Sequence, residues 1–419
     1  MNGARVLLNT LLEAGVKVCF SNPGTSEMHF VAALDQTEGM RCVLCLFEGV
    51  ASGAADGYGR MANAPAATLL HLGPGLGNAL ANLHNARRAR TPLINIIGDH
   101  ASYHLRFDAP LTSDVAAVAR PMSHWVRSTA SADDVARDGA EAVAQATRYP
   151  GQVASLILPA DASWHRTVHR HTPLSEPPPA PTVDDAAIED ALQALKSGDA
   201  SMLILGGALS ADHLNTAARI ARKTGARLAV DTFPTRVARG RGVAEVERLP
   251  YIPERASETL KDVKHAVLAG TRAPVSFFAY PLMQSELLPS QAHVHPFCSI
   301  EQDIGDALER LAVAVGADVP LPESKAMPPE LPTGALNSTS IACSIAAQLP
   351  AGAIVVDEGI VGGAEVFSSC AASAPHDWII QTGGSIGWGL PAAVGAAIAC
   401  PERKVLCLEG DGSAMYTIQ

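Results

Sequence analysis

The sequence predicts an α/β protein in which three consecutive domains each carry a mainly parallel sheet wrapped by helices. Short apolar runs such as "CVLCLF", "PLINIIG" and "VASLIL" alternate with helix-like segments such as "GNALANLHNARRAR". Two proline-rich stretches, residues 171–181 and 320–332, interrupt this alternation as interdomain linkers do. With 419 residues, 47% of them hydrophobic, the chain is long enough for about three such domains.

The three predicted domains cover residues 1–170, 183–319 and 335–419. The middle one repeats the alternation with "ASMLILGGA", the helical "HLNTAARIARKTG" and "ARLAVDTF". The last one contains "AIVVDEG", "DWIIQT" and "KVLCLEGDG", and the sequence stops shortly after that strand. We therefore expect the third domain to be incomplete and to expose part of its apolar sheet.

Composition and charge argue against several classes of protein. The chain carries 31 basic and 42 acidic residues, a net charge of −11, and no basic cluster that could follow a phosphate backbone. We therefore do not expect nucleic acid to be a partner. Neither a secretory leader nor an apolar run of about 18 residues is evident, so we expect no membrane segment. The eight cysteines lie in apolar segments, which favours a cytoplasmic protein with reduced thiols. Cys42 and Cys45 form a CxxC, but no second pair stands at zinc spacing.

Polar residues follow two apolar strands near the amino terminus. In "SNPGTSEMHF", Thr25 and Ser26 either cap the helix that follows or touch a substrate at the strand end. In "LFEGVASG", Glu48 starts a helix directly after an apolar strand. It is either a partner of the helix dipole or a carboxyl group tuned by burial for proton transfer, and the sequence leaves both interpretations open.

A glycine-rich turn follows the strand in "LLHLGPGLGN". Gly73 and Gly75 start a dinucleotide fingerprint, but Asn78 replaces its third glycine and no acidic residue follows at the required place. This pattern disfavours a nicotinamide enzyme. His71, at the end of the strand, is either structural or an acid or base.

A second glycine-rich turn, Gly383–Gly387, matches the GxSxG pattern of a nucleophile elbow. A serine hydrolase using Ser385 is therefore a rival enzyme class. That fold requires a histidine after the serine, and none follows His376.

Four motifs taken together resemble the thiamine diphosphate-dependent enzymes that include acetolactate synthase, benzoylformate decarboxylase and pyruvate decarboxylase. They are "NPGTSE", "FEGVASGAADGYGRMA", "GPGLGNALANLHNARRARTPL" and "EGDGSAMYTIQ". The resemblance implies a pyrimidine-binding, a central and a diphosphate-binding domain in this order. It places the cofactor between the first domain of one subunit and the third of another, so the full-length protein would be a homodimer or homotetramer.

The resemblance also implies residue roles on the cofactor side. Glu48 would hydrogen-bond the aminopyrimidine ring and promote activation of the cofactor. Ile386 would support the cofactor from below, and the Gly384 carbonyl would accept from its amino group. Asp411 would bind Mg²⁺, which prefers oxygen ligands. The diphosphate would lie against the turn formed by Gly410, Asp411, Gly412 and Ser413.

On the substrate side, Thr25, Ser26 and His71 match positions that handle the substrate in benzoylformate decarboxylase-like members. The loop "GDHASYHLRFD" adds His100 and His104 as candidates. The activity implied is decarboxylation or carboligation of a 2-oxo acid. The central domain lacks the flavin-binding pattern, so FAD is not expected.

The ending "EGDGSAMYTIQ" contains only the first part of the magnesium and diphosphate motif, whose closing asparagines would lie beyond Gln419. From this we expect a truncated chain of a longer enzyme. A catalytically silent fragment that does not retain the cofactor is the alternative from a different class.

Overall fold

The computed structural model describes residues 1–318, 320–321, 326–360 and 362–419. Part of the predicted linker at 320–332 therefore lies outside the described residues. The chain forms two compact units. Unit 1 consists of Met1–Pro179, Val356–Gly359 and Gln381–Gln419, and unit 2 of Ala180–Val355 and Ile360–Ile380. The division into domains at 1–170, 183–319 and 335–419 stays a prediction.

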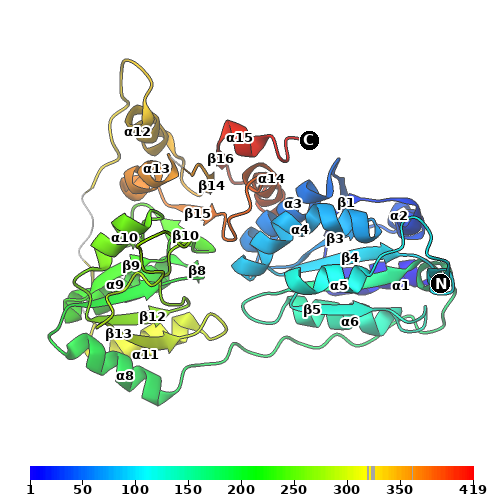
Figure 1. Ribbon diagram of the computed structural model, residues 1–419, viewed down its shortest axis with the longest axis horizontal. Helices are drawn as coiled ribbons and strands as arrows, with labels where there is room; N and C mark the ends of the chain where they lie inside the picture. Colours follow the sequence, from blue (N-terminus) through cyan, green and yellow to red (C-terminus); the bar gives the residue numbers. More distant parts are fainter. Residues whose placement is uncertain (319, 322–325, 361) are drawn as a thin grey trace. The chain divides into compact units, whose positions relative to one another are not determined.

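Unit 1 is built around a six-stranded sheet with the order β2-β1-β3-β4-β6-β5, in which all recorded pairs are parallel (Figure 1). Its strands are β1 (Val18–Asn22), β2 (Arg41–Leu44), β3 (Ala66–Leu70), β4 (Leu93–Asp99), β5 (Trp125–Ser128) and β6 (Val153–Pro159). The helices from the same part of the chain are α1 (Gly3–Glu13), α2 (Met28–Asp35), α3 (Glu48–Ala62), α4 (Leu72–Ala89), α5 (Val115–Ala119), α6 (Val135–Ala146) and α7 (Ala160–Trp164).

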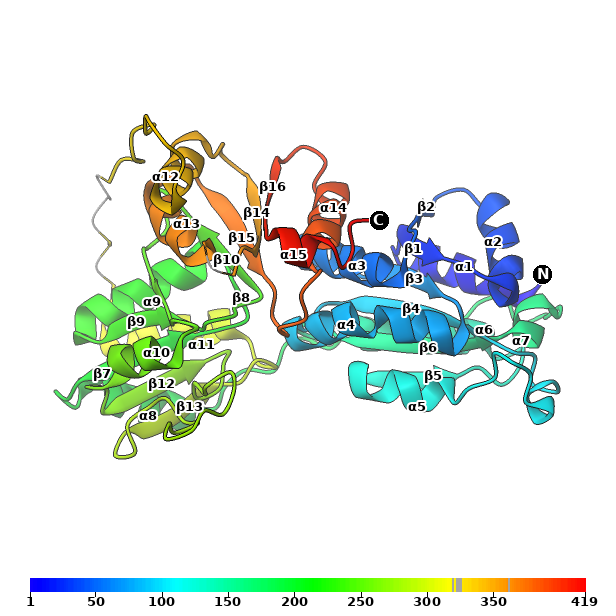
Figure 2. The ribbon, with the colours of Figure 1, turned by 45° about the horizontal axis from the view of Figure 1, so that its top comes forward.

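The central strands of this sheet are apolar on both faces because helices cover both of them. On strand β3, Ala67 and Leu69 belong to the core shared with α1, α2 and α6, whereas Ala66 and Leu70 belong to the core shared with α3, α4 and α5. Figure 2 shows α3 and α4 running across one face of this sheet. The helices that begin after β2 and β3 thus start at the carboxyl edge of the sheet, where polar residues gather.

Unit 2 contains a five-stranded parallel sheet with the order β11-β9-β7-β12-β13. Its strands are β7 (Ser201–Leu205), β9 (Arg227–Val230), β11 (Glu247–Arg248), β12 (His265–Ala269) and β13 (His293–Cys298). The helices of this part are α8 (Asp185–Lys196), α9 (Ala211–Thr224), α10 (Pro253–Leu260) and α11 (Ile304–Val315). Separate apolar clusters cover its two faces, as expected for a parallel sheet.

A third sheet has the strand order β16-β14-β15-β10-β8. Its strands are β8 (Ala208–Leu209), β10 (Arg236–Arg239), β14 (Ile354–Glu358), β15 (His376–Ile380) and β16 (Val405–Glu409). The remaining helices are α12 (Ser338–Gln348), α13 (Gly363–Ser369), α14 (Gly389–Ala399) and α15 (Asp411–Ala414). Strand β10 runs antiparallel to β15, so this sheet is mixed. The sequence did not indicate that β8 and β10 extend this sheet.

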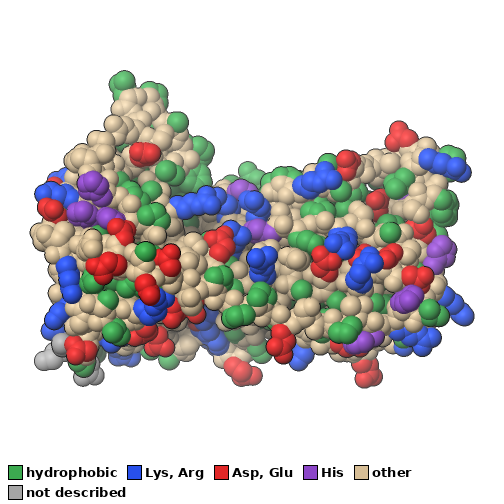
Figure 3. Space-filling model, turned by 90° about the horizontal axis from the view of Figure 1, so that it is seen from below, with side chains coloured by type: hydrophobic (Ala, Val, Ile, Leu, Met, Phe, Trp, Pro, Cys, Tyr) green, Lys and Arg blue, Asp and Glu red, His purple; other side chains and the backbone are tan. Residues whose placement is uncertain are grey.

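The predicted fold class is confirmed: the protein is α/β, with three mainly parallel sheets wrapped by helices. Among the described helices, none is both long and apolar enough to cross a bilayer. Acidic and basic side chains are intermingled on the face seen in Figure 3.

Candidate cofactor and active site

Helices α3 and α14 pack backbone to backbone through small residues. A Cβ atom on Gly57 would clash with the carbonyl group of Ala392, and one on Gly395 would clash with that of Ala54. Glycine at these two positions therefore permits an approach that a larger side chain would prevent. This packing fixes the turn that precedes α14 against the first part of the chain.

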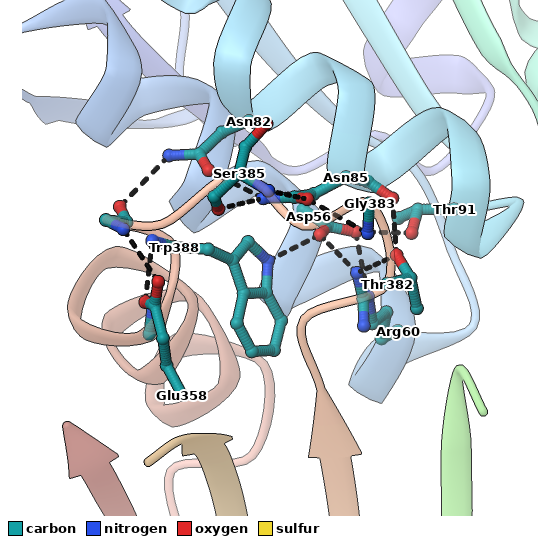
Figure 4. A network of polar contacts seen from close by, with 12 residues as sticks. Asp56, Arg60, Asn82, Asn85, Thr91, Glu358, Thr382, Gly383, Ser385 and Trp388 are labelled. Carbon is teal, nitrogen blue, oxygen red and sulfur yellow. Dashed lines mark hydrogen bonds and ion pairs between the residues drawn. The ribbon is translucent and has the colours of Figure 1, made fainter. Parts of the chain in front are cut away.

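A buried polar network holds the same turn (Figure 4). Asp56 and Arg60 form an ion pair of 2.6 Å between Oδ2 and Nη2, with both side chains inaccessible to solvent. Trp388 Nε1 donates to Asp56 Oδ2 at 2.6 Å, and Thr91 Oγ1 donates to Asp56 Oδ1. Arg60 Nη2 also donates to Thr382 Oγ1 at 3.3 Å. Because these partners satisfy the buried carboxylate, the network can stabilise the fold while tying both ends of the turn to α3.

Two asparagines of α4 hold the middle of the turn. Asn85 Nδ2 donates to the Ser385 carbonyl oxygen at 2.8 Å, and Asn85 Oδ1 accepts from the Ser385 amide at 3.3 Å. Asn82, three residues earlier on the same helix face, donates to the Gly387 carbonyl oxygen at 3.2 Å. Gly384 and Gly387 have φ values of 80° and 87°, which favour glycine. The GxSxG turn is thus a backbone structure held by side chains of α4.

Glu358 lies at the carboxyl end of β14 and accepts from three consecutive amides at the start of α14. The Gly387 amide donates at 2.7 Å and the Trp388 amide at 2.8 Å, and the Gly389 amide donates to the same carboxylate. Burial, together with the nearby Glu409 carboxylate, raises the pKa of Glu358 to about 7, although the amides oppose this rise. The carboxylate therefore caps α14 at a considerable cost in desolvation.

The acidic turn after β16 is open to solvent. Asp411 and Gly412 are exposed, and the Gly412 amide donates to Asp411 Oδ1 at 2.9 Å. A Cβ atom on Gly412 would meet nothing within 4 Å, so a ligand can approach the backbone closely. Ser413 is buried and donates to Glu409. Within the described part of the chain, no three acidic, histidine or cysteine side chains converge as metal ligands. A cation at Asp411 would need further oxygen ligands, such as those of a diphosphate.

The Glu48 carboxyl group is buried at the start of α3. Asn78 Nδ2 donates to Glu48 Oε2 at 2.9 Å. A Cβ atom on Gly75 would lie 2.9 Å from Glu48 Oε1 and 3.2 Å from His71 Cβ. The structure thus brings Glu48 and His71 to the same place, and the lack of a side chain on Gly75 permits both to approach it. In the sequence, Asn78 was noted only because it replaces the third glycine of a dinucleotide fingerprint. In the structure it is the hydrogen-bond partner of the Glu48 carboxyl group.

His71 is held by a second buried carboxylate, Glu27. His71 Nδ1 lies 2.8 Å from Glu27 Oε2, which also accepts from the Gly24 amide at 2.7 Å. Ser26 Oγ donates to Glu27 and lies 3.3 Å from His71 Nδ1. The carboxylate orients the imidazole through Nδ1 and leaves Nε2 for exchange of a proton.

The backbone around His71 is shaped for this arrangement. Leu72, buried and next in the chain, has a φ of 47°, which is unusual for a leucine and is the kind of strain found at functional sites. A Cβ atom on Gly24 would clash with the His71 ring, and one on Gly98 would clash with the Glu27 carboxylate. Both glycines therefore leave the space that the pair occupies.

The other substrate-side candidates lie in the segments that follow β1 and β4. Thr25 is exposed in the short 3₁₀ helix Thr25–Glu27. The rings of His100 and His104 lie 5.5 Å apart, and no recorded hydrogen bond joins either histidine to His71 or Ser26 in the described chain. Within the part of the chain that the structure describes, His100 Nε2 is buried without a hydrogen-bond partner. A buried unpaired nitrogen is available to a ligand.

The CxxC cysteines form no disulfide: Cys42 and Cys45 are both free. Cys42 Sγ lies 3.1 Å from Ser21 Oγ. Burial raises the pKa of Cys45 to about 11, so its thiol is protonated at neutral pH. Neither observation indicates redox chemistry.

Comparison with known proteins defines the family. Residues 1–119 match the model of the thiamine pyrophosphate enzyme N-terminal TPP binding domain, and residues 361–419 match that of the C-terminal TPP binding domain. The chain is 54% identical, over its whole length and 80% of the relative, to the IlvX protein of Mycobacterium tuberculosis, which carries the name of an acetolactate synthase large subunit. The chain belongs to the thiamine diphosphate-dependent enzymes, the family that its motifs resemble.

Two further comparisons agree with this assignment. Benzoylformate decarboxylase of Pseudomonas aeruginosa is 29% identical over 96% of this chain and 80% of its own length. The structure of a thiamine diphosphate-dependent 4-hydroxybenzoylformate decarboxylase from Rhodococcus jostii superposes with a TM-score of 0.83 at 26% identity, covering 100% of this chain and 82% of the other. The family assignment gives no support to a serine hydrolase. The described structure also records no hydrogen bond from the Ser385 side chain to a histidine.

Sequence reasoning missed several residues of the site. The sequence motifs assigned no role in the site to Glu27, Glu358 or Glu409. A signal existed for all three, because each carboxyl group follows an apolar strand or the turn after it. Asn82 and Asn85 are spaced three apart on a helix, a pattern that marks one face but not what that face contacts.

Proposed function

We propose that the protein is a thiamine diphosphate- and magnesium-dependent enzyme that acts on a 2-oxo acid by decarboxylation, carboligation or both. The observation that carries this proposal is the buried Glu48 carboxyl group, which accepts a hydrogen bond from Asn78 and lies against Gly75 beside His71. The names of the relatives, an acetolactate synthase large subunit and benzoylformate decarboxylases, support the two reaction types.

The family pattern assigns the cofactor-side roles in this proposal. The Glu48 carboxyl group hydrogen-bonds the aminopyrimidine ring. Ile386, half-buried in the turn before α14, supports the cofactor, and the Gly384 carbonyl group accepts from its amino group. The turn after β16 binds the diphosphate, with Asp411 on the Mg²⁺ ion, through Gly410, Asp411, Gly412 and Ser413. When bound, thiamine diphosphate supplies the electron sink for cleavage of the bond to the substrate carboxylate.

On the substrate side, His71 exchanges a proton through Nε2, since Nδ1 is engaged by Glu27. Its side chain is 23% exposed, which allows contact with a small ligand. Ser26 binds the substrate carboxylate in this proposal by turning its hydroxyl from Glu27 to the substrate, and Thr25, His100 and His104 remain secondary candidates. A 2-oxo acid fits this set because it offers a carboxylate and a carbonyl oxygen to one hydroxyl and one imidazole.

We also propose that the active protein is a cytoplasmic homodimer or homotetramer. In the family pattern, Glu48 of one subunit meets the cofactor held by the turns of another. A dimer is then the smallest unit in which the Glu48 side chain and the Asp411 turn act on one cofactor molecule.

The test compares wild type with Glu48→Gln. Calorimetric titration with thiamine diphosphate and Mg²⁺ should give saturable binding to both proteins. Turnover of a panel of 2-oxo acids, scored for carbon dioxide and for acyloin products, should fall at least about a hundredfold in the variant, the range found for loss of a proton-transfer group. Glu38→Gln, the same change at an exposed position, is the matched control. Failure of the wild type to bind the cofactor would indicate a catalytically silent chain, and full activity of Glu48→Gln would overturn the role of Glu48.

A further inference from the structure

Glu358 is connected to both turns that the proposed function assigns to the cofactor. In the third sheet, β14 lies between β16 and β15. Glu358 ends β14, the turn Gly383–Gly387 follows β15, and the turn at Gly410 follows β16. A side chain at the end of the middle strand can therefore reach the turns on both sides.

Toward the first turn, the contacts of Glu358 are numerous and short. The two carboxylate oxygens accept from the amides of Gly387, Trp388 and Gly389. When the carboxyl group is ionised, these hydrogen bonds are about twice as strong as neutral ones. The end of the GxSxG turn and the start of α14 are thus held by a single side chain.

Toward the second turn, Glu358 meets Glu409. A Cβ atom on Gly389 would lie 3.0 Å from Glu358 Oε2 and would clash with Glu409 Oε2, so the two carboxyl groups converge on one glycine. Glu409 Oε1 accepts from the Gly410 amide at 3.1 Å and from Ser413 Oγ. Glu409 Oε2 is buried and lies against the same glycine as Glu358 Oε2, where the two carboxyl groups can share a proton.

We propose that Glu358 is a positioning residue that joins the two cofactor-binding turns into one rigid surface, directly through the α14 amides and through Glu409 on the other side. This inference rests on the proposed function, since it concerns the same site. In this proposal Glu358 acts through the two turns and not by contact with the cofactor or the substrate. It sets the distance between the part of the site that binds the aminopyrimidine ring and the part that binds the diphosphate.

If Glu358 couples the two turns, its replacement should affect the binding of thiamine diphosphate and of pyrophosphate differently. Loss of a helix cap alone would not produce this difference. Under the proposed function, thiamine diphosphate would contact both turns, whereas inorganic pyrophosphate with Mg²⁺ would contact only the turn after β16. Loss of the connection should therefore weaken binding of the whole cofactor more than binding of pyrophosphate, because the bound geometry would no longer be preorganised. A purely structural role would lower thermal stability without this selectivity.

The experiment measures both ligands by calorimetry on wild type and Glu358→Gln in the presence of Mg²⁺. Glutamine places an amide donor against backbone donors, so at least one of the three hydrogen bonds is lost. We expect thiamine diphosphate to bind roughly tenfold or more weakly, the effect of losing hydrogen bonds to a charged group. Affinity for pyrophosphate should change little. Asp114→Asn is the matched control, because Asp114 caps α5 in the same unit through the Ala117 amide.

Three results would overturn the inference. Unchanged cofactor binding by Glu358→Gln would exclude the positioning role and leave the proposed function intact. An equal loss of affinity for both ligands would indicate local disruption instead of lost coupling. Absence of cofactor binding by the wild type would overturn the proposed function, and this inference with it. Far-UV circular dichroism and the melting temperature establish that the variant is folded, and Glu358→Asp, which keeps the charge, should restore part of the selectivity.

Discussion

Replacement of Asp56 by alanine is expected to destabilise the contact between α3 and α14 strongly. Asp56 and Arg60 are both fully buried, so removal of the carboxylate breaks a buried ion pair. Breaking one partner of such a buried pair costs about 3–5 kcal/mol. Trp388 Nε1 and Thr91 Oγ1 lose their acceptor in the same step. The total loss of stabilising free energy is therefore at least about 4 kcal/mol. This corresponds to an increase of about a thousandfold in the equilibrium constant for local opening.

Hydrogen exchange followed by mass spectrometry is the suitable assay, since a chain of two compact units need not unfold in one step. Peptides covering α3 and α14 should exchange faster in Asp56→Ala by about that factor. Asp35→Ala, the same change at an exposed helical position, is the control. The double variant Asp56→Leu with Arg60→Leu should recover much of the protection, because an apolar pair avoids the desolvation of both charges. Protection in Asp56→Ala close to that of the control would refute this reasoning.

Two further outcomes are expected. Burial, ahead of two nearby arginines, lowers the pKa of His124 to about 4 from the ordinary 6.5, and its Nδ1 accepts from the Val153 amide at 3.1 Å. The contribution of neutral His124 to stability is therefore complete above pH 6.5 and is lost as the pH falls toward 4. As the pH is lowered, the urea midpoint should decline less steeply in His124→Gln than in wild type. Equal dependence of the midpoint on pH in the two proteins would contradict this. Gly98→Ala should push a methyl group against the Glu27 carboxylate and lower turnover by about tenfold or more with cofactor affinity retained. Gly77→Ala, where the added methyl group meets nothing, is the control, and equal turnover in the two variants would speak against the role of Glu27.

The sequence predicted those features that depend on neighbours in the chain. Strand and helix alternation was sufficient for the fold class, and Glu48 and the turn at Asp411 were identified because each follows an apolar run in the sequence. The partners of the site were not predictable in the same way. Glu27 contacts a histidine 44 residues away, and Asn85 binds a backbone group 300 residues away. Such pairs leave no periodic signal in one sequence.

The third sheet illustrates the same limit. Strands β8 and β10 have two and four residues, too few for an alternating pattern to establish their presence or their neighbours. Their pairing is decided by the contacts of the folded chain, with Arg236 opposite Ile379 on β15. Nothing in the local sequence of residues 236–239 distinguishes an edge of the central sheet from an extension of the third.

The close packing of α3 on α14 has a consequence for synthesis of the protein in the cell. The Asp56–Trp388 hydrogen bond joins residues 332 positions apart. At about 5–20 residues per second, the ribosome would need roughly 17 to 66 s to make the second partner after the first. During this interval the glycine-rich face of α3 and its buried charges lack the helix that covers them. The amino-terminal segment therefore stays incompletely packed until α14 has been synthesised. In this state, binding by a chaperone would compete with aggregation.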